Sequence, residues 1–189
     1  MATQKFWKHK RSIMKRYDET ADKYDARYEE EQYRKYQSVL GLIRFDSDDV
    51  VLDNGCGTGL FMKEVSMQAK MVIGVDLSIN MLKKAHERLK EVDKAHIVHC
   101  DSDNLPFRKD VFSKVAAFTL IQNMPNPCIT IFEAKKASSE RSIFILTFLK
   151  RKFNLDEIRK LLIKAHLLLV NTLDENDLKD YIIICKNSM

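Results

Sequence analysis

The sequence has no long apolar run, no apolar segment near its start and no close pair of cysteines. Uninterrupted apolar stretches such as 143–146 and 167–170 are short, whereas a membrane-spanning helix needs roughly 20 apolar residues. Residues 1–17 contain no apolar segment of the kind that directs secretion. The four cysteines are widely spaced and form no CxxC pair, which argues against a disulfide framework and a zinc site. We therefore expect a cytoplasmic protein with no membrane association and no bound metal.

The composition is that of an ordinary globular protein. The 189 residues include 45% hydrophobic and 31% charged ones, and this length suits one domain with a substantial core. The chain has no internal repeat, low-complexity tract or linker. We therefore expect a single domain over residues 1–189, with a helical, tyrosine-rich extension at 1–45 and an α/β core at 46–189.

Charge is unevenly distributed along the chain. The formal net charge is +5, and residues 1–16 contain no acidic residue. An acid-rich stretch follows at 18–31. The two basic clusters consist of Lys5, Lys8, Lys10, Arg11, Lys15 and Arg16 in the first, and Lys150, Arg151 and Lys152 in the second. Such clusters are usually solvated surface, so their meaning depends on where the fold places them.

From residue 49 onward, short apolar runs that suit strands alternate with amphipathic runs that suit helices. Strands are expected in seven stretches, at 50–54, 71–76, 96–100, 113–121, 141–149, 167–173 and 179–186. Helices are expected at 60–70, 79–92, 129–137 and 155–167, with Ser78 and Asn154 as N-caps. This alternation predicts a doubly wound parallel sheet with helices on both faces, closed by a pair of strands.

A glycine-rich turn follows the first expected strand in the stretch VLDNGCGTGLF, residues 51–61. Its three glycines form GxGxG, which differs from the GxGxxG of dinucleotide sites, and no Gly-Lys-Ser/Thr follows as in a phosphate-binding loop. Asp53 stands in front of the turn, where a carboxylate would repel a phosphate and attract a cation. S-adenosylmethionine carries a sulfonium and an ammonium and no phosphate, so it suits this turn; an ordinary structural turn is the alternative.

Two further carboxylates end the next two expected strands. Asp76 ends the second strand, where it can accept hydrogen bonds from both hydroxyls of a ribose. Asp101 ends the third strand, where it can accept one from an exocyclic adenine amine. Ligands of doubly wound sheets bind at the carboxyl ends of the strands. The glycine turn and the three carboxylates together therefore predict a cofactor site at that edge.

Four stretches, 51–59, 74–78, 101–107 and 112–125, resemble the successive motifs of class I S-adenosylmethionine-dependent methyltransferases. They are most similar to the branch that includes the ubiquinone and menaquinone methyltransferases, and residues 17–28 resemble the helix that covers the cofactor there. The resemblance implies a Rossmann-like, seven-stranded sheet in the order 3-2-1-4-5-7-6 with an antiparallel last strand. By position in the motifs it implies cofactor contacts from Asp53, Gly55, Cys56, Gly57, Gly59, Asp76, Leu77, Met81, Asp101, Ser102, Phe118, Thr119 and Tyr24.

The sequence departs from this branch in ways that leave the methyl acceptor open. SSERS stands at 138–142 where a Pro-Gly-Gly turn is usual, and the fourth motif ends in IQNMPNP without the histidines common in relatives. The NPPY-type motif of many amino-group methylators is absent, as is an insertion between strands six and seven.

Methyl transfer from a sulfonium is an in-line displacement that needs alignment and desolvation more than an acid or a base. Gln122 and Asn123 follow the fourth strand, where their amides can orient an acceptor amine or hydroxyl; capping a turn is the alternative. Tyr17, Tyr24 and Tyr28 share one helical face and are expected to pack rather than to catalyse.

The basic clusters favour a polyanionic acceptor. Lys150, Arg151 and Lys152 follow the fifth strand at the cofactor edge, and the N-terminal cluster precedes the helix that covers this edge. We therefore expect an RNA substrate, tRNA or rRNA, held through basic patches. A small or lipid-like acceptor, a protein acceptor, and a non-catalytic cofactor-binding subunit remain open. A small activator subunit is a further expected partner, because no RNA-binding accessory domain is visible.

Overall fold

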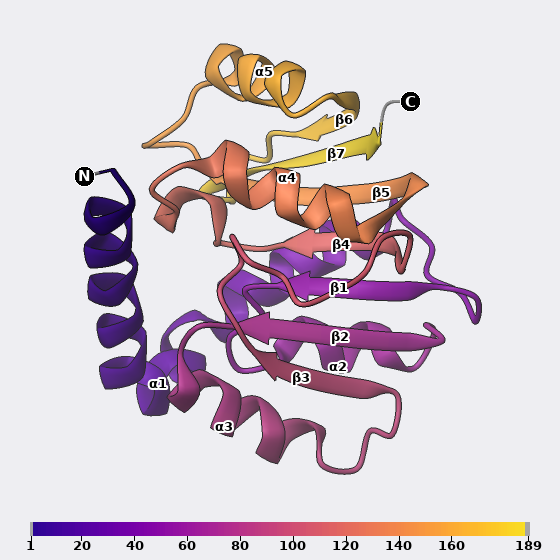
Figure 1. Ribbon diagram of the computed structural model, residues 1–189. Coiled ribbons are helices and arrows are strands. Elements are labelled where there is room, and N and C mark those ends of the chain that lie inside the picture. The colour runs from indigo at the N-terminus through magenta and orange to yellow at the C-terminus, as the bar shows by residue number, and fades with distance from the viewer. Residues whose placement is uncertain (1, 188–189) are drawn as a thin grey trace.

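The computed structural model describes residues 2–187 and contains a seven-stranded sheet with helices on both faces (Figure 1). The sheet order is β3-β2-β1-β4-β5-β7-β6, in which β7 runs antiparallel to both β5 and β6. The strands are β1 Val50–Asn54, β2 Met71–Asp76, β3 Ala95–His99, β4 Phe112–Ala117, β5 Ser138–Leu149, β6 Leu167–Leu173 and β7 Asp180–Asn187. The predicted fold and strand order are confirmed.

The helices cover the two faces of the sheet through separate apolar clusters. They are α1 Ala2–Leu40, α2 Leu60–Ser66, α3 Ile79–Leu89, α4 Pro127–Ala137 and α5 Leu155–Lys164, with a 3₁₀ turn, η1, at Ile121–Asn123. Successive β1 residues alternate between the faces: Val51 packs with α2, α3 and the end of α1, while Leu52 packs with α4 and α5. Within residues 2–187, no helix is long and apolar enough to cross a membrane.

Both predicted N-caps are present. The Ser78 hydroxyl accepts a hydrogen bond from the Met81 amide and begins α3. Asn154 and Glu157 form a reciprocal capping box at the start of α5. The Ser78 cap also fixes the backbone that leaves the carboxyl end of β2, which is part of the candidate site.

Two strand boundaries differ from the prediction by more than one residue. β4 ends at Ala117, because Thr119 adopts a left-handed backbone with φ 58° and turns the chain into η1. β5 begins at Ser138, so the SSERS stretch is strand rather than turn, and Ser138 pairs with Phe112 before a register shift. The largely apolar stretch 118–121 resembles a strand in sequence, yet its first three residues line a cavity.

Helix α1 has two parts with different packing. Near its end, the Tyr36 ring contacts Phe61 and Phe118 at centroid distances of 5.2 Å and 4.8 Å, which inserts this part into the core. The N-terminal half, the indigo helix in Figure 1, lies across the ends of the strands toward which β1 and β2 point. It therefore covers the edge at which a cofactor site is expected.

Candidate cofactor and acceptor site

A cavity lies between α1 and the carboxyl ends of β1 to β4. It measures about 710 Å³, counting the mouth that opens to solvent. Its walls include most of the predicted cofactor residues, namely Tyr24, Gly55, Gly57, Asp76, Leu77, Met81, Asp101, Ser102, Phe118 and Thr119. A smaller space of about 300 Å³ adjoins it and shares Tyr24, Gly55, Gly57 and Phe118 with it. Asp53 and Cys56 line this second space, which we call the inner cavity.

The glycines of the turn have different roles. Gly57 has φ 54°, and a Cβ at this position would meet no atom within 4 Å, so the backbone leaves open space on the cavity side. Gly59 lines neither cavity; a Cβ there would lie 3.1 Å from Leu89 and 3.2 Å from Ala85. Gly59 therefore lets α3 pack closely against the turn, and the structure does not place it at the cofactor as predicted.

Asp76 is held in place by backbone donors. The Gly57 and Ser78 amides donate to its two oxygens at 2.9 Å and 2.8 Å. Burial raises the pKa of Asp76, and these two amides counteract the rise. The carboxylate lines the main cavity beside Leu77 and Met81, where it can accept from ribose hydroxyls.

Asp53 lies in the inner cavity with one oxygen unsatisfied. It is 2% exposed, and its Oδ2 has no hydrogen-bond partner among residues 2–187. Burial, together with the negative charge of Asp76, raises the pKa of Asp53 to about 8. A buried carboxylate without a donor is a site at which a bound cation would be stabilised.

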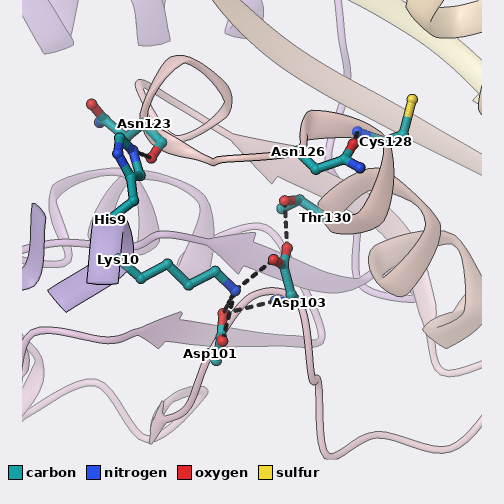
Figure 2. A network of polar contacts seen from close by, with 8 residues as sticks. All are labelled: His9, Lys10, Asp101, Asp103, Asn123, Asn126, Cys128 and Thr130. Atoms are coloured by element: carbon teal, nitrogen blue, oxygen red, sulfur yellow. Dashed lines mark hydrogen bonds and ion pairs between the residues drawn. The ribbon is translucent and has the colours of Figure 1, made fainter. Parts of the chain in front are cut away.

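Asp101 is engaged by a lysine from α1, as Figure 2 shows. Lys10 Nζ lies 2.8 Å and 2.7 Å from the two Asp101 oxygens and 2.5 Å from Asp103 Oδ2. The Thr130 hydroxyl of α4 donates to Asp103 at 2.6 Å. Lys10 is only 7% exposed, so the prediction that it meets RNA phosphates is wrong: this ammonium is neutralised inside the protein. Asp103 is not among the predicted site residues, although it follows Asp101 in an Asp-x-Asp pattern directly after a strand.

Asn123 and Gln122 are neighbours in the chain, but only Asn123 lines the main cavity. Asn123 lines the main cavity, where its Nδ2 donates to the Tyr17 hydroxyl at 3.0 Å and to the Thr119 carbonyl at 2.8 Å. The backbone carbonyl of Asn123 accepts a hydrogen bond from the His9 ring of α1 (Figure 2). Gln122 is buried and lines neither cavity, so its position does not suit the predicted role of orienting an acceptor.

The tyrosines of α1 combine packing with a place at the cavity. The ring centroid of Tyr24 lies 6.0 Å from that of Tyr17 and 5.0 Å from that of Tyr28, as expected for a packed face. Tyr17 and Tyr24 also line the main cavity, where burial raises the pKa of both phenols. They therefore stay protonated and act there as donors and apolar walls, with Ile13 and Met14 beside them.

The second basic cluster lies outside both cavities. Lys150 pairs with Asp174 at 2.7 Å and donates to the Glu175 carbonyl at 2.6 Å. Lys152 donates to the Gln122 carbonyl at 2.8 Å, and Arg151 is exposed. Much of this positive charge is therefore used within the fold.

The donor and acceptor groups fit S-adenosylmethionine. Asp76 suits the ribose, Asp101 and Ser102 the adenine edge, and Asp53 a positive group at the other end. Thr119 lines the main cavity, and Phe118 lines both cavities. Within residues 2–187, no group of three or more His, Cys, Asp or Glu side chains is arranged to hold a metal ion.

Comparison with known proteins agrees with this geometry. Residues 51–137 match the family model described as "Methyltransferase domain". The malonyl-[acyl-carrier protein] O-methyltransferase of Marinomonas sp. (strain MWYL1) is 34% identical over 114 residues, 57% of this chain and 42% of that protein. The demethylmenaquinone methyltransferase of Staphylococcus saprophyticus is 29% identical over 110 residues, 56% of this chain and 47% of that protein. The 18S rRNA (guanine-N(7))-methyltransferase bud23 of Schizosaccharomyces pombe is 30% identical over 112 residues, which are 58% of this chain and 41% of that protein.

Among solved structures, a chain from the complex of the Haloferax volcanii Trm112 methyltransferase activator is similar, with a TM-score of 0.80 and 16% identity. The match covers 92% of this chain and 98% of that one. The segments aligned with the first three curated relatives make up 40% to 53% of those proteins' lengths, so this chain spans about half of them. The glycine turn, the strand-end carboxylates, the sheet order and these matches agree: residues 51–137 match a methyltransferase domain, and the chain is similar to the class I methyltransferases, whose methyl donor is S-adenosylmethionine.

Proposed function

We propose that the protein transfers the methyl group of S-adenosylmethionine to a small-molecule acceptor bound in the main cavity. The observation that carries this proposal is the cover that α1 forms over the strand ends. Ile13, Met14 and Tyr17 of α1 share the cavity walls with Thr119 and Asn123. An acceptor that reacts beneath this cover must be small or must present a slender group.

The residues of the chain would bind and align rather than exchange protons. Asp76 would hold the ribose and Asp101 the adenine amine, while the bound cofactor supplies an electrophilic methyl group. Asn123 would orient the acceptor, because Tyr17 and Thr119 already fix its amide. Ile13 and Met14 would exclude water, which favours displacement at a sulfonium.

The comparisons support a small acceptor more than RNA. The names of the Marinomonas and Staphylococcus relatives specify a malonyl group on a carrier protein and demethylmenaquinone. One relative is named for rRNA, yet Lys10 and Lys150 of this chain are engaged in internal ion pairs. A small activator subunit is a candidate partner that the test below includes, since the Haloferax structure contains such an activator.

Methyl transfer from labelled S-adenosylmethionine to a cell extract, separated into small-molecule, RNA and protein fractions, tests the proposal. We expect label in the small-molecule fraction, with and without a Trm112-type activator added. Asn123→Ala should lower kcat roughly tenfold or more, because a misaligned acceptor reacts slowly. Label found only in RNA would overturn the small-molecule acceptor, and S-adenosylmethionine binding without transfer to any fraction would favour a non-catalytic subunit.

A further inference from the structure

One member of each basic cluster, together with a histidine, reaches the short turn η1. His9 and Arg16 come from the N-terminal half of α1, and Lys152 follows β5, which runs parallel to β4 and ends at the same edge of the sheet. The His9 ring lies 3.0 Å from the Asn123 carbonyl oxygen, as Figure 2 shows. Arg16 Nη2 lies 3.4 Å from Asn123 Oδ1, and Lys152 Nζ lies 2.8 Å from the Gln122 carbonyl oxygen. The two basic clusters therefore converge on η1.

The positive charge at η1 is not neutralised by the fold. Arg16 and Lys152 donate there to amide and carbonyl oxygens, and neither forms an ion pair with a carboxylate among residues 2–187. Lys10 and Lys150 differ, because both are paired with aspartates. A guanidinium has five N–H donors and an ammonium three, which is more than η1 engages. An anion at η1 would therefore meet unused donors and positive charge.

Arg16 is the cation best placed to meet a ligand. Its guanidinium carbon lies 5.0 Å from the centre of the Tyr17 ring, in a cation–π contact that holds the group in place. Tyr17 and Asn123 both line the main cavity and are hydrogen-bonded to each other. Arg16 is exposed and contacts both of them, so it lies at the mouth of this cavity. A guanidinium in this position can bind a carboxylate through two parallel N–H donors.

The cavity walls on this side are apolar. Ile13, Met14, Leu120 and Met124 line the main cavity and are only partly buried, so the fold leaves part of their surface for a ligand. The carboxylates of the cavity stand at the ends of β2 and β3, where they would repel an acid. An acidic ligand would therefore be oriented with its carboxylate toward Arg16 and its apolar body along these walls.

Resting on the function proposed above, we propose that the methyl acceptor is a small amphipathic acid whose carboxylate binds Arg16. Lys152 adds positive charge at the same turn, and the methylated atom lies deeper in the cavity, beside Asn123. Arg16 is then a residue that determines which acceptor is used. A phosphate of RNA would also suit a guanidinium, but single-stranded RNA is held in a basic groove with stacked bases. Here Lys10 and Lys150 are neutralised within the fold, and the walls beside Arg16 are aliphatic.

Transfer of a labelled methyl group to a small-molecule extract, divided by anion exchange into acidic and non-acidic fractions, tests this proposal. We expect the parent to label the acidic fraction. Arg16→Met should lower the initial rate at low extract concentration, which reports kcat/KM, about tenfold, as for a lost hydrogen bond to a charged group. Arg16→Lys should recover part of the rate, because it keeps the charge and loses the two parallel donors. Arg11→Met is the matched control, since Arg11 is exposed and lies two residues from His9, on the opposite side of α1.

Isothermal titration should give parent and variants the same affinity for S-adenosylhomocysteine, because Arg16 lies outside the cofactor's part of the cavity. A matching loss of this affinity in Arg16→Met would mean that Arg16 acts through the fold, which overturns the proposal. An unchanged transfer rate in Arg16→Met, or label confined to non-acidic small molecules, would also overturn it and leave the small-molecule function standing. Label found only in RNA, or in no fraction, would instead contradict the proposed function and the inference with it.

Two ligands of known structure give a second reading. Octanoate and octanamide have the same apolar chain, and only octanoate carries a negative charge. Octanoate should inhibit transfer by the parent more strongly than octanamide does, and Arg16→Met should remove this difference. Equal inhibition of the parent by both ligands would show that the apolar walls alone select the acceptor, which would refute a carboxylate site at Arg16.

Discussion

At the scale of single residues, Asp53 combines a structural cost with the binding role proposed for it. Asp76, Tyr36, Tyr24 and Cys56 lie around it, and no lysine or arginine is among the residues that line the inner cavity. Its pKa of about 8 lies far above the ordinary 3.8. Between these values the folded protein holds a proton that the unfolded chain has released, so stability falls as the pH rises from about 4 to about 8 and then levels off.

Asp53→Asn should remove this dependence, because the amide keeps the shape and does not ionise. We expect the variant to exceed the parent in free energy of unfolding at pH 8 by on the order of 3–5 kcal/mol, with little difference near pH 4. Urea unfolding at pH 4, 6 and 8 measures the difference. The variant should keep the smaller slope due to Asp76, whose pKa is also raised. Parallel pH profiles of parent and variant would contradict this account.

At the scale of elements, the N-terminal half of α1 is attached to the body by polar contacts at both sides of the main cavity. Lys10 joins it to Asp101 and Asp103, and His9 joins it to the Asn123 carbonyl (Figure 2). Asp18 accepts from the Ser78 hydroxyl at 2.6 Å further along. Few large apolar side chains are buried in this half, so the Lys10 cluster is a main attachment.

Lys10→Met should release this part of the helix. The substitution leaves two carboxylates side by side without a cation, and breaking a buried ion pair from one side costs about 3–5 kcal/mol. We expect the local opening of residues 2–17 to increase, so trypsin should cleave after Lys5 or Lys15, which both variants retain, at least tenfold faster. Lys8→Met is the matched control, because it also removes one cleavage site and Lys8 is exposed. Equal cleavage rates in the two variants would show that Lys10 does not hold the helix.

At the scale of the whole molecule, the site joins elements that are far apart along the chain. Its walls come from α1, the turn after β1, and the ends of β2, β3 and β4. A ligand that contacts all of them binds the folded state only, so it raises the free energy of unfolding by mass action.

S-adenosylhomocysteine at about 100 times its Kd should stabilise the protein by about 2.7 kcal/mol, which corresponds to a rise in Tm of roughly 5–10 °C for a chain of this size. Gly57→Arg should abolish the rise, because its side chain would enter the open space beside Gly57. Circular dichroism checks that the variant is folded, and a melting curve measures the shift. A full shift in Gly57→Arg would place the ligand elsewhere.

Much of the fold was predictable from local patterns. The bounds of β1 and β2 follow from short apolar runs that end in Asn54 and Asp76. The caps at Ser78 and Asn154 follow from side chains that bond their own helix. The strand order came from the resemblance to a family, because alternation alone does not determine which strands are neighbours.

The glycine turn and the strand-end carboxylates Asp76 and Asp101 follow from local sequence, because backbone geometry and strand ends are set by residues adjacent in the chain. Which side chains face those carboxylates depends on how distant segments pack together. Lys10 reaches Asp101 across a separation of 91 residues. Nothing in the sequence of α1 distinguishes Lys10 from Lys8 and Lys15, which are exposed to solvent. The sequence likewise does not show that Gln32 lies beside Asp53 in the inner cavity. It also does not show that Asn123 lines the main cavity while its neighbour Gln122 is buried outside it. The path of α1 over the sheet edge places Lys10 and Gln32 beside these carboxylates. This path depends on how the Tyr36 end of the helix packs against Phe61 and Phe118.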